Sequence, residues 1–340
     1  MSSDRNRRVC VAGSLYCFTF YLLLSTEDEI NRTVFVFDKN INKSIQDKIP
    51  YKYYLDYNTW YGKNRYIRSI YTCLIKRFKY PELYNSNIYG LDFNWDLLRG
   101  FVLKYIEDAP FVFDIWETGP MYQDYLNSKK TTWFKRLFRK IYFGPYYLSP
   151  VGTSKKVTDI YTTNKVSKPY LENKNIHLLD WKTLWNNSTE SKRKLILFIF
   201  DISNEDLLKL KNKNIILLTQ AFSDDKMVTE DEQIEIYDKI ISNYNAEDVV
   251  IKPHPRDRID YKKEFPHILY FDKTVPMQLL AVLGVKFDRV VTVTSSSALS
   301  FGIDVQIDWY GGEVHPGILK GEGVRTLEDA KKNYNRVHGA

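Results

Sequence analysis

Residues 248–256 read DVVIKPHPR, an apolar run that ends at a histidine between two prolines. The run at 248–252 carries two valines and an isoleucine, and it predicts a buried β-strand. Pro253 and Pro255 favour an extended backbone on both sides of His254, so the imidazole is held rigidly just beyond the strand. Ligands of open parallel α/β sheets bind at this edge. The stretch therefore indicates such a sheet, with a candidate site at the end of one strand.

Stretches typical of strands and helices alternate around this motif. A helix is expected over residues 229–245, because Thr229 and Glu232 match the capping-box pattern at its start. Strands are expected at 194–200, 214–219 and 289–293. This alternation predicts a parallel sheet with helices on both faces.

The first half of the chain shows the same alternation. Its apolar run at 9–24 follows three arginines and resembles a signal anchor, but it is shorter than the roughly 20 residues of a spanning helix and is interrupted by Gly13 and Ser14. We favour a strand at 8–12, a turn and a helix at 15–25, the usual start of a nucleotide-binding α/β domain. Further strands are expected at 31–38, 110–116 and 157–163, and helices at 61–77 and 94–106.

Two α/β halves in a chain of 340 residues predict two Rossmann-like domains with parallel sheets facing a central cleft. A polar, irregular stretch that contains Pro169 separates the halves. We therefore expect an N-terminal domain at 1–165, an interdomain connection at 166–190 and a C-terminal domain at 191–340.

The composition is that of a folded soluble protein, with 44% hydrophobic and 27% charged residues. The formal net charge of +7 favours an anionic partner, such as a nucleotide, a membrane surface or a nucleic acid. We expect no nucleic-acid partner, because no recognised binding motif accompanies the charge. Cys10, Cys17 and Cys73 cannot all pair and lack metal-ligand spacing, which favours a reduced, cytoplasmic setting.

Two sets of residues in the second half carry chemistry. His254 can donate a proton or a hydrogen bond to a departing phosphate at neutral pH, and a structural loop histidine is the alternative. The serines at 295–297 follow an expected strand, where hydroxyls and free backbone N–H groups at a helix N-terminus bind anions. An ordinary helix cap is the alternative for them. His315 also precedes a proline, but it follows no strand and receives no role.

The first half contributes an acid. Glu117 ends the expected strand at 110–116, and Gly119 lets the chain turn sharply after it. This carboxylate could act as general base toward an acceptor hydroxyl, with a capping or solvated acid as the alternative. Together with His254 and the serines, it would supply a base, a leaving-group stabiliser and a phosphate site for inverting displacement at a sugar carbon.

Three stretches of the second half resemble glycosyltransferase family 52, which includes lipooligosaccharide and capsule sialyltransferases. They are LLTQAFSDD at 217–225, EQIEIY at 232–237 and IKPHPR at 251–256. The sequence ETG at 117–119, the His-Pro pair and the serine cluster are also similar, in that order, to motifs of bacterial sialyltransferases. The resemblance covers about residues 155–302.

The resemblance implies a GT-B fold and an inverting, metal-independent transfer of sialic acid from CMP-sialic acid to a galactose-type hydroxyl of capsular polysaccharide or lipooligosaccharide. It implies that Glu117 is the catalytic base and that His254 interacts with the CMP phosphate. Two of the three serines would bind the phosphate, and the residues around them would lie near the donor. The implied donor-binding residues are Ser295, Ser296, Ser297, Thr219, Gln220, Pro255 and Gln278.

Two positions depart from the family pattern. Thr118 replaces the second acid of the acid-acid-Gly motif, which keeps a non-catalytic nucleotide- or carbohydrate-binding protein open. Gln278 stands where a glutamate for the ribose hydroxyls is expected. An amide still bonds a diol, but another nucleotide sugar becomes an alternative donor.

A single donor phosphate needs less charge compensation than a diphosphate, and the sequence has no Asp-X-Asp metal motif. We therefore expect neither a metal nor another cofactor. The segment 129–143 reads KKTTWFKRLFRKIYF, a basic amphipathic pattern that fits an anionic membrane surface or a helix docked on its own domain. The first alternative would place the protein on the inner face of the bacterial plasma membrane, near a lipid-linked glycan acceptor. A homodimer is left open.

Overall fold

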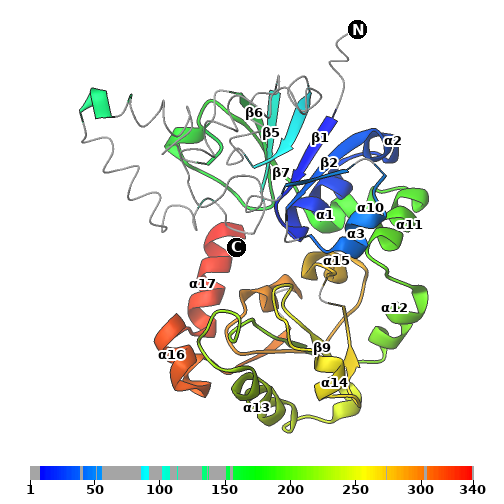
Figure 1. Ribbon diagram of the computed structural model, residues 1–340, viewed down its shortest axis with the longest axis vertical. Coiled ribbons are helices and arrows are strands. Elements are labelled where there is room, and N and C mark those ends of the chain that lie inside the picture. Colours follow the sequence, from blue (N-terminus) through cyan, green and yellow to red (C-terminus); the bar gives the residue numbers. More distant parts are fainter. Residues whose placement is uncertain are drawn as a thin grey trace. The chain divides into compact units, whose positions relative to one another are not determined.

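The structure is a computed structural model (Figure 1). It describes residues 8–38, 41–50, 52–55, 86–91, 102–107, 113, 132–135, 137, 151–153, 156–272, 274–301 and 305–338. The chain divides into two compact units, Met1–Ile196 and Leu197–Ala340. Each is an α/β unit built on a parallel sheet.

The described part of the first unit contains a seven-stranded sheet in the order β3-β2-β1-β4-β5-β6-β7. All neighbouring strands are parallel. The chain runs outward from β1 to β3 and then returns to add β4 on the other side of β1. The strands are β1 (Arg8–Ala12), β2 (Thr33–Asp38), β3 (Lys52–Leu55), β4 (Asn87–Gly90), β5 (Val102–Ile106), β6 (Val157–Thr162) and β7 (Asn175–Leu178).

The apolar run near the N-terminus forms β1 and helix α1 (Leu15–Leu24), as predicted. Ser14 caps the helix by accepting a hydrogen bond from the Cys17 backbone N–H at 3.1 Å. Nine of the ten residues of α1 are buried, because the helix packs on the sheet and against α10 (Trp181–Asn186). The apolar character of residues 9–24 therefore reflects their burial in the core of the first unit. No helix among the described residues has the length and apolar character needed to cross a membrane.

One prediction for the first unit differs from the structure, and two others fall largely or wholly outside the described residues. Residues 102–106 form the strand β5, whereas a helix was expected over 94–106. The sequence VLKYI lies within the sheet and is buried at most positions, so its apolar spacing does not separate helix from strand. The strand expected at 110–116 lies outside the described residues except for Phe113, which is helical, and the helix expected at 61–77 lies wholly outside them.

The stretch expected to connect the domains belongs to the first unit. Within 166–190 the chain forms a short 3-10 turn, η1 (Pro169–Leu171), then β7, the last strand of the first sheet, and α10. The strand expected at 194–200 is instead part of helix α11 (Glu190–Ile199), inside which the division between the units falls. Thr189 starts this helix by accepting a hydrogen bond from the Lys192 N–H at 3.2 Å.

The second unit has a five-stranded parallel sheet in the order β10-β9-β8-β11-β12 among its described residues. The strands expected at 214–219, 248–252 and 289–293 and the helix expected at 229–245 are confirmed. The strands are β8 (Ile215–Leu218), β9 (Val249–Lys252), β10 (Leu269–Tyr270), β11 (Arg289–Thr292) and β12 (Gln306–Trp309). The two parallel sheets confirm the predicted fold class.

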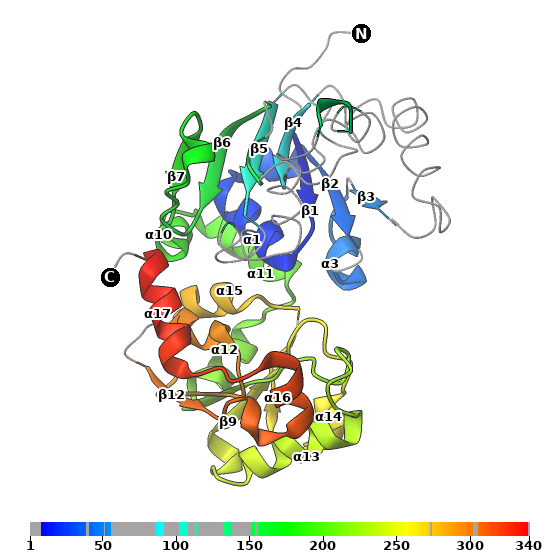
Figure 2. The ribbon, with the colours of Figure 1, turned by 90° about the vertical axis from the view of Figure 1, so that its left-hand side faces the viewer.

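Helices surround this second sheet (Figures 1 and 2). Thr229 and Glu232 form the predicted capping box of α13, and α16 lies beside α13 in both views. The remaining elements are α12 (Asn204–Lys211), α13 (Glu230–Ile241), η2 (Ala246–Asp248), α14 (Tyr261–Glu264), α15 (Met277–Val282), η3 (Ser296–Phe301), η4 (Gly312–Val314), α16 (Pro316–Glu322) and α17 (Leu327–His338). The first unit also contains α2 (Glu27–Asn31) and α3 (Lys43–Asp47).

The strand order sets where a ligand can bind in the second unit. From β8 the chain adds β9 and β10 on one side, and it then adds β11 and β12 on the other. The loops after β8 and β11 therefore diverge, and the crevice at such a switch point is the usual ligand site of open α/β sheets. The loop after β9 carries His254 to the same edge.

Candidate functional site

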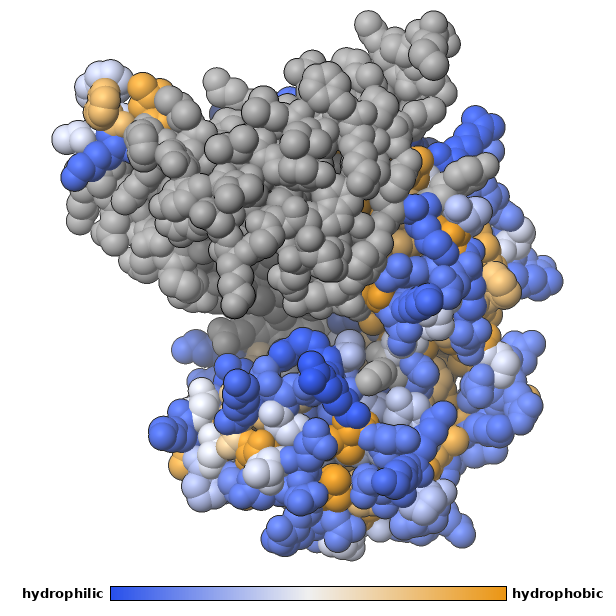
Figure 3. Space-filling model, in the orientation of Figure 1, coloured by the Kyte–Doolittle hydropathy of each residue, from blue (hydrophilic) through white to orange (hydrophobic). Residues whose placement is uncertain are grey.

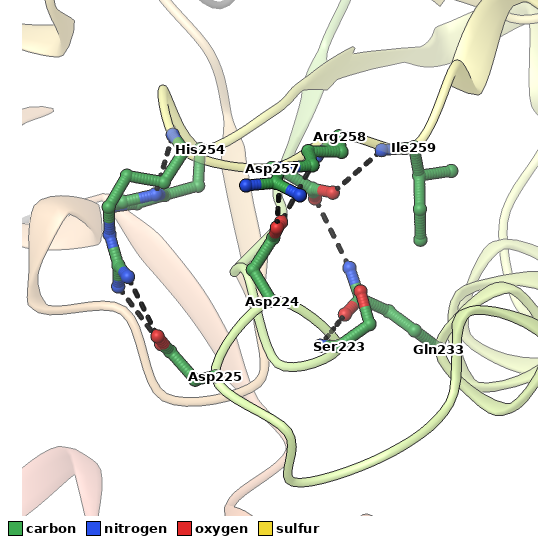
Figure 4. Close-up of polar contacts among 9 residues, drawn as sticks. Ser223, Asp224, Asp225, Gln233, His254, Asp257, Arg258 and Ile259 are labelled. Atoms are coloured by element: carbon green, nitrogen blue, oxygen red, sulfur yellow. Dashed lines mark hydrogen bonds and ion pairs between the residues drawn. The ribbon is translucent and has the colours of Figure 1, made fainter. Parts of the chain in front are cut away.

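The candidate site lies at the carboxyl ends of β8, β9 and β11, on the loops that follow these strands. Figure 4 shows the loop after β8, which carries Asp224 and Asp225, facing the loop after β9, which carries His254 and Asp257. The predicted residues Thr219, Gln220, His254 and Pro255 therefore belong to the same edge of one sheet.

His254 is held in one protonation state by its surroundings. Its backbone N–H donates to the Thr219 hydroxyl at 3.3 Å, and its Nδ1 accepts a hydrogen bond from the Arg256 N–H at 3.2 Å. Burial, together with the nearby Arg256 and Lys252 cations, lowers the pKa of His254 to about 4. The imidazole is therefore neutral at pH 7. With Nδ1 acting as acceptor, the proton is on Nε2, which is a hydrogen-bond donor.

A buried polar network lies beneath the histidine loop, centred on Asp257. This carboxylate is fully buried and accepts hydrogen bonds from the Thr219 hydroxyl at 2.9 Å and the Tyr261 hydroxyl at 2.8 Å. Gln233 Nε2 lies 3.2 Å from the same oxygen, and the Ile259 N–H donates to the other oxygen at 3.1 Å. Burial raises the pKa of Asp257, while the hydrogen bonds favour its charged form.

Two ion pairs tie the loops after β8 and β9 together at the surface (Figure 4). The Arg256 guanidinium binds both oxygens of Asp225, at 2.7 and 2.9 Å, and lowers the pKa of that carboxyl. Arg258 Nε lies 3.0 Å from Asp224. A bidentate arginine–carboxylate pair fixes orientation as well as adding charge attraction. The Asp225 pair therefore holds Arg256, whose N–H bonds the His254 ring.

Gln220 joins the ends of β8 and β11. Its side-chain oxygen accepts from the Thr294 N–H at 2.8 Å, and its Nε2 donates to the Thr294 hydroxyl at 2.8 Å. Thr294 also bonds the carboxylate of Glu322, and the Gln220 backbone N–H donates to the Tyr237 hydroxyl at 2.7 Å. The side chains of Thr219 and Gln220, which were predicted to lie near the donor, thus have partners within the protein.

The three predicted serines follow β11 directly. Ser295 donates its N–H to the Thr292 hydroxyl at 3.1 Å, and Ser296 is exposed. Ser296 and Ser297 begin η3, a six-residue 3-10 helix, where an α-helix was expected. Gln278 is half-buried near the start of α15, which contacts η3. The serines and Gln278 therefore lie on neighbouring elements.

One predicted residue cannot be placed. Glu117, with Thr118 and Gly119, lies outside the described residues. Its role as base stays a prediction.

No role was assigned from the sequence to Asp257, Gln233 or Tyr261. Asp257 stands between two arginines, a pattern typical of a solvated loop, and Gln233 follows three acids at the start of a helix. The one available signal was the polar residue Gln233 on the apolar face of α13, four residues before Tyr237.

His315, to which no role was assigned, caps α16 by accepting the Gly317 N–H at 3.1 Å on its Nδ1. This helix lies directly on the loop after β8. A Cβ atom at Gly317 would be 2.0 Å from the carbonyl oxygen of Met227, and one at Gly321 would be 2.7 Å from its sulfur. At Gly317, where the obstacle is main chain, only glycine allows this approach.

A second buried acid lies in the first unit, directly after β5. Glu107 is fully buried and accepts hydrogen bonds from the hydroxyls of Tyr16 and Thr162, both at 2.6 Å. The Thr163 N–H and hydroxyl also donate to it, at 2.8 and 2.6 Å. With every donor supplied by the protein, Glu107 joins α1, β5 and β6 as a structural group.

Comparisons with known proteins identify relatives of the chain. The family model for glycosyltransferase family 52 matches residues 121–316. An uncharacterized protein of Haemophilus influenzae is 37% identical over 192 residues, which are 56% of this chain. The matched stretch spans 60% of that relative's length.

The solved structures similar to this chain include three of Photobacterium sialyltransferases. A sialyltransferase from Photobacterium damsela has a TM-score of 0.53 at 15% identity, covering 95% of this chain and 80% of that chain. An alpha/beta-galactoside alpha-2,3-sialyltransferase from Photobacterium phosphoreum has a TM-score of 0.51 at 11% identity, covering 93% and 95%. The GT-B domain of a Photobacterium damselae sialyltransferase has a TM-score of 0.50 at 14% identity, covering 88% and 89%. At these identities the likeness shows the fold, which is of the GT-B type.

Proposed function

Because the chain belongs to glycosyltransferase family 52, we propose that it is an inverting sialyltransferase. It would move sialic acid from CMP-sialic acid to a galactose-type hydroxyl of a capsular polysaccharide or lipooligosaccharide. The observation that carries the proposal is the neutral His254, whose Nε2–H is a donor at the ligand-binding edge of the second sheet.

In the proposed reaction the bond between the anomeric carbon and the phosphate oxygen breaks, and its electron pair goes to that oxygen. His254 stabilises the departing phosphate through Nε2–H. When the phosphate anion raises the pKa of His254 so that the ring takes up a second proton, the imidazolium can also pass a proton to the leaving oxygen. The acceptor hydroxyl forms the new bond to the anomeric carbon from the opposite face and gives its proton to Glu117. Attack opposite the leaving group inverts the configuration at that carbon.

Charge supports the choice of an anionic donor for this edge. Lys252 and Arg256 lower the pKa of His254, so their positive field reaches the imidazole. The serines at 295–297 would contact the phosphate, with Pro255 beside them, and Gln278 would bond the ribose hydroxyls. A donor with one phosphate can be neutralised by such groups, and we propose that turnover needs no metal.

A panel of nucleotide sugars tests the donor. The purified protein should release CMP from CMP-sialic acid, measured by chromatography, and hydrolyse UDP- and GDP-linked sugars at least about tenfold more slowly. Faster turnover of another donor would instead favour the family-related alternative suggested by Gln278. CMP binding without turnover of any donor would favour a non-catalytic binding protein.

The same assay tests metal independence. Turnover of CMP-sialic acid should be unchanged in excess EDTA, and added Mg²⁺ or Mn²⁺ should not raise it. A loss of activity in EDTA that Mg²⁺ reverses would contradict this part of the proposal.

We also propose that residues 129–143 bind the anionic inner face of the plasma membrane, close to a lipid-linked acceptor. In the described part of this segment, Trp133, Phe134 and Leu137 are 70, 66 and 44% exposed. Figure 3 shows hydrophobic groups, in orange, beside hydrophilic ones, in blue, at the upper left. The sequence from 125 to 158 contains no acid. Exposed aromatic side chains beside cations are typical of interfacial helices.

Charge reversal tests this contact. Arg136→Glu with Arg139→Glu should weaken co-sedimentation with anionic phospholipid vesicles by at least about tenfold, because each basic residue near such a surface contributes about 1 kcal/mol. The matched control, Lys211→Glu with Lys332→Glu, changes the net charge equally on exposed residues of the second unit. Binding that survives the first pair of changes would rule out an electrostatic contact through this segment.

A further inference from the structure

Thr219 connects the buried network to the histidine loop through a single hydroxyl. Its Oγ1 donates to Asp257 Oδ2 at 2.9 Å, and the same oxygen accepts the His254 N–H at 3.3 Å. The direction of both bonds follows from the carboxylate, which can only accept. The Thr219 side chain is 2% exposed, so no solvent molecule can take its place easily.

The groups that hydrogen-bond Asp257 are themselves oriented by the Gln233 side chain. The Gln233 amide donates to the Gln220 carbonyl and the Tyr261 hydroxyl, both at 2.8 Å, and accepts the Ser223 N–H at 2.7 Å. The Tyr261 hydroxyl in turn donates a hydrogen bond to Asp257. Because Gln233 is fully buried on α13, the carboxylate is held by a helix of the core as well as by the Ile259 N–H of the loop that carries it.

The loop is closed on itself as well. The Asp257 N–H donates to the His254 carbonyl at 2.9 Å, so a tight turn spans 254–257. The backbone of His254 is therefore held at its N–H through Thr219 and at its carbonyl by Asp257. The charged groups that act on the ring are Arg256 and Lys252, which lower its pKa, and Asp225 and Asp224, which raise it.

We propose that Asp257 is a positioning residue that acts on His254 through the Thr219 hydroxyl, with Gln233 orienting the carboxylate. Only the expected effect on turnover depends on the proposed function. The orientation of the His254 ring can be measured without any substrate.

Two substitutions of Thr219 separate the effect of its hydroxyl from the effect of its branched shape. Thr219→Val keeps the branched side chain and removes the hydroxyl, whereas Thr219→Ser keeps the hydroxyl. We expect Thr219→Val to lower kcat for release of CMP from CMP-sialic acid by about 10- to 100-fold, because a small misplacement of a catalytic group can cost about 10²-fold in rate, with a smaller change in KM. Thr219→Ser should recover most of that loss. Asp257→Asn, which replaces an acceptor oxygen with an N–H donor, should resemble Thr219→Val.

The second readout is the His254 ring itself, followed by ¹⁵N–¹H NMR and assigned from the spectrum of His254→Gln. In the wild type the ring should be neutral with its proton on Nε2 and should titrate near pH 4. In Thr219→Val the pKa should move toward the ordinary value of about 6.5 as the ring gains freedom and solvent. Ile240→Val on the core face of α13 controls for a general loss of stability and should leave the titration unchanged.

The proposal would be overturned if Thr219→Val kept the wild-type kcat and the wild-type titration of His254. It would also be overturned if Thr219→Ser lost as much kcat as Thr219→Val. A loss of kcat in Ile240→Val matching that in Thr219→Val would show a merely structural effect. If the wild type turns over no CMP-sialic acid, the proposed function fails, and the NMR titration still decides whether the network positions His254.

Discussion

Glu117→Gln should lower the rate of sialyl transfer by about 10²–10⁴-fold, the usual contribution of a general base. The amide is nearly the same size as the carboxylate but cannot accept the proton of the acceptor hydroxyl. CMP affinity should stay almost unchanged, because the base contacts the acceptor and not the nucleotide. Steady-state kinetics with a galactose-terminated acceptor and calorimetric titration with CMP would measure the two quantities separately.

The control for this change is Glu172→Gln, which makes the same replacement on an exposed residue of the first unit. Its turnover should match the wild type. Near-normal transfer by Glu117→Gln would remove this residue from the mechanism, and another acid would then have to serve as base.

His254→Ala should also lower turnover by about 10²–10⁴-fold, because it removes both the hydrogen bond to the phosphate and the proton that can follow. His254→Gln places an amide N–H close to the position of Nε2–H but supplies no proton. We therefore expect the glutamine variant to recover CMP affinity relative to alanine while its turnover stays low. Equal turnover in the glutamine variant and the wild type would contradict proton transfer from His254.

The pH dependence of CMP binding gives a second test of His254. In the free protein its pKa is about 4, and an adjacent phosphate anion favours the charged ring and raises that pKa. Binding should therefore take up protons at pH values just above 4, and affinity should rise as pH falls toward that value. CMP titrates in this range as well, so the relevant quantity is the proton uptake of the wild type minus that of His254→Gln. Calorimetry in buffers of different ionisation enthalpy measures it, and a difference of zero would contradict the assignment.

The sequence predicted the second unit well because its elements have local signals. The strands β8, β9 and β11 are short, apolar and β-branched, and the capping box at Thr229 marks the start of α13. The prolines around His254 made the end of β9 conspicuous. These features depend on neighbours in the chain, so they can be recognised without coordinates.

The failures have a different physical origin. The run KLILFIF at 194–200 is apolar on all sides, and only the polar residues before it show that it continues a helix. The network beneath His254 joins residues far apart in sequence, such as Gln220 with Thr294 and Gln233 with Asp257. No local pattern encodes such pairs, because the fold brings them together only after both strands and α13 have packed.

The close approach of α16 to the loop after β8 limits how this protein can diverge. At Gly317 the obstacle is the main-chain carbonyl of Met227, which no substitution at 227 can remove, so related proteins that keep this packing must keep glycine there. At Gly321 the obstacle is the Met227 side chain. A larger residue at 321 should therefore occur only together with a smaller one at 227, and the two positions should co-evolve.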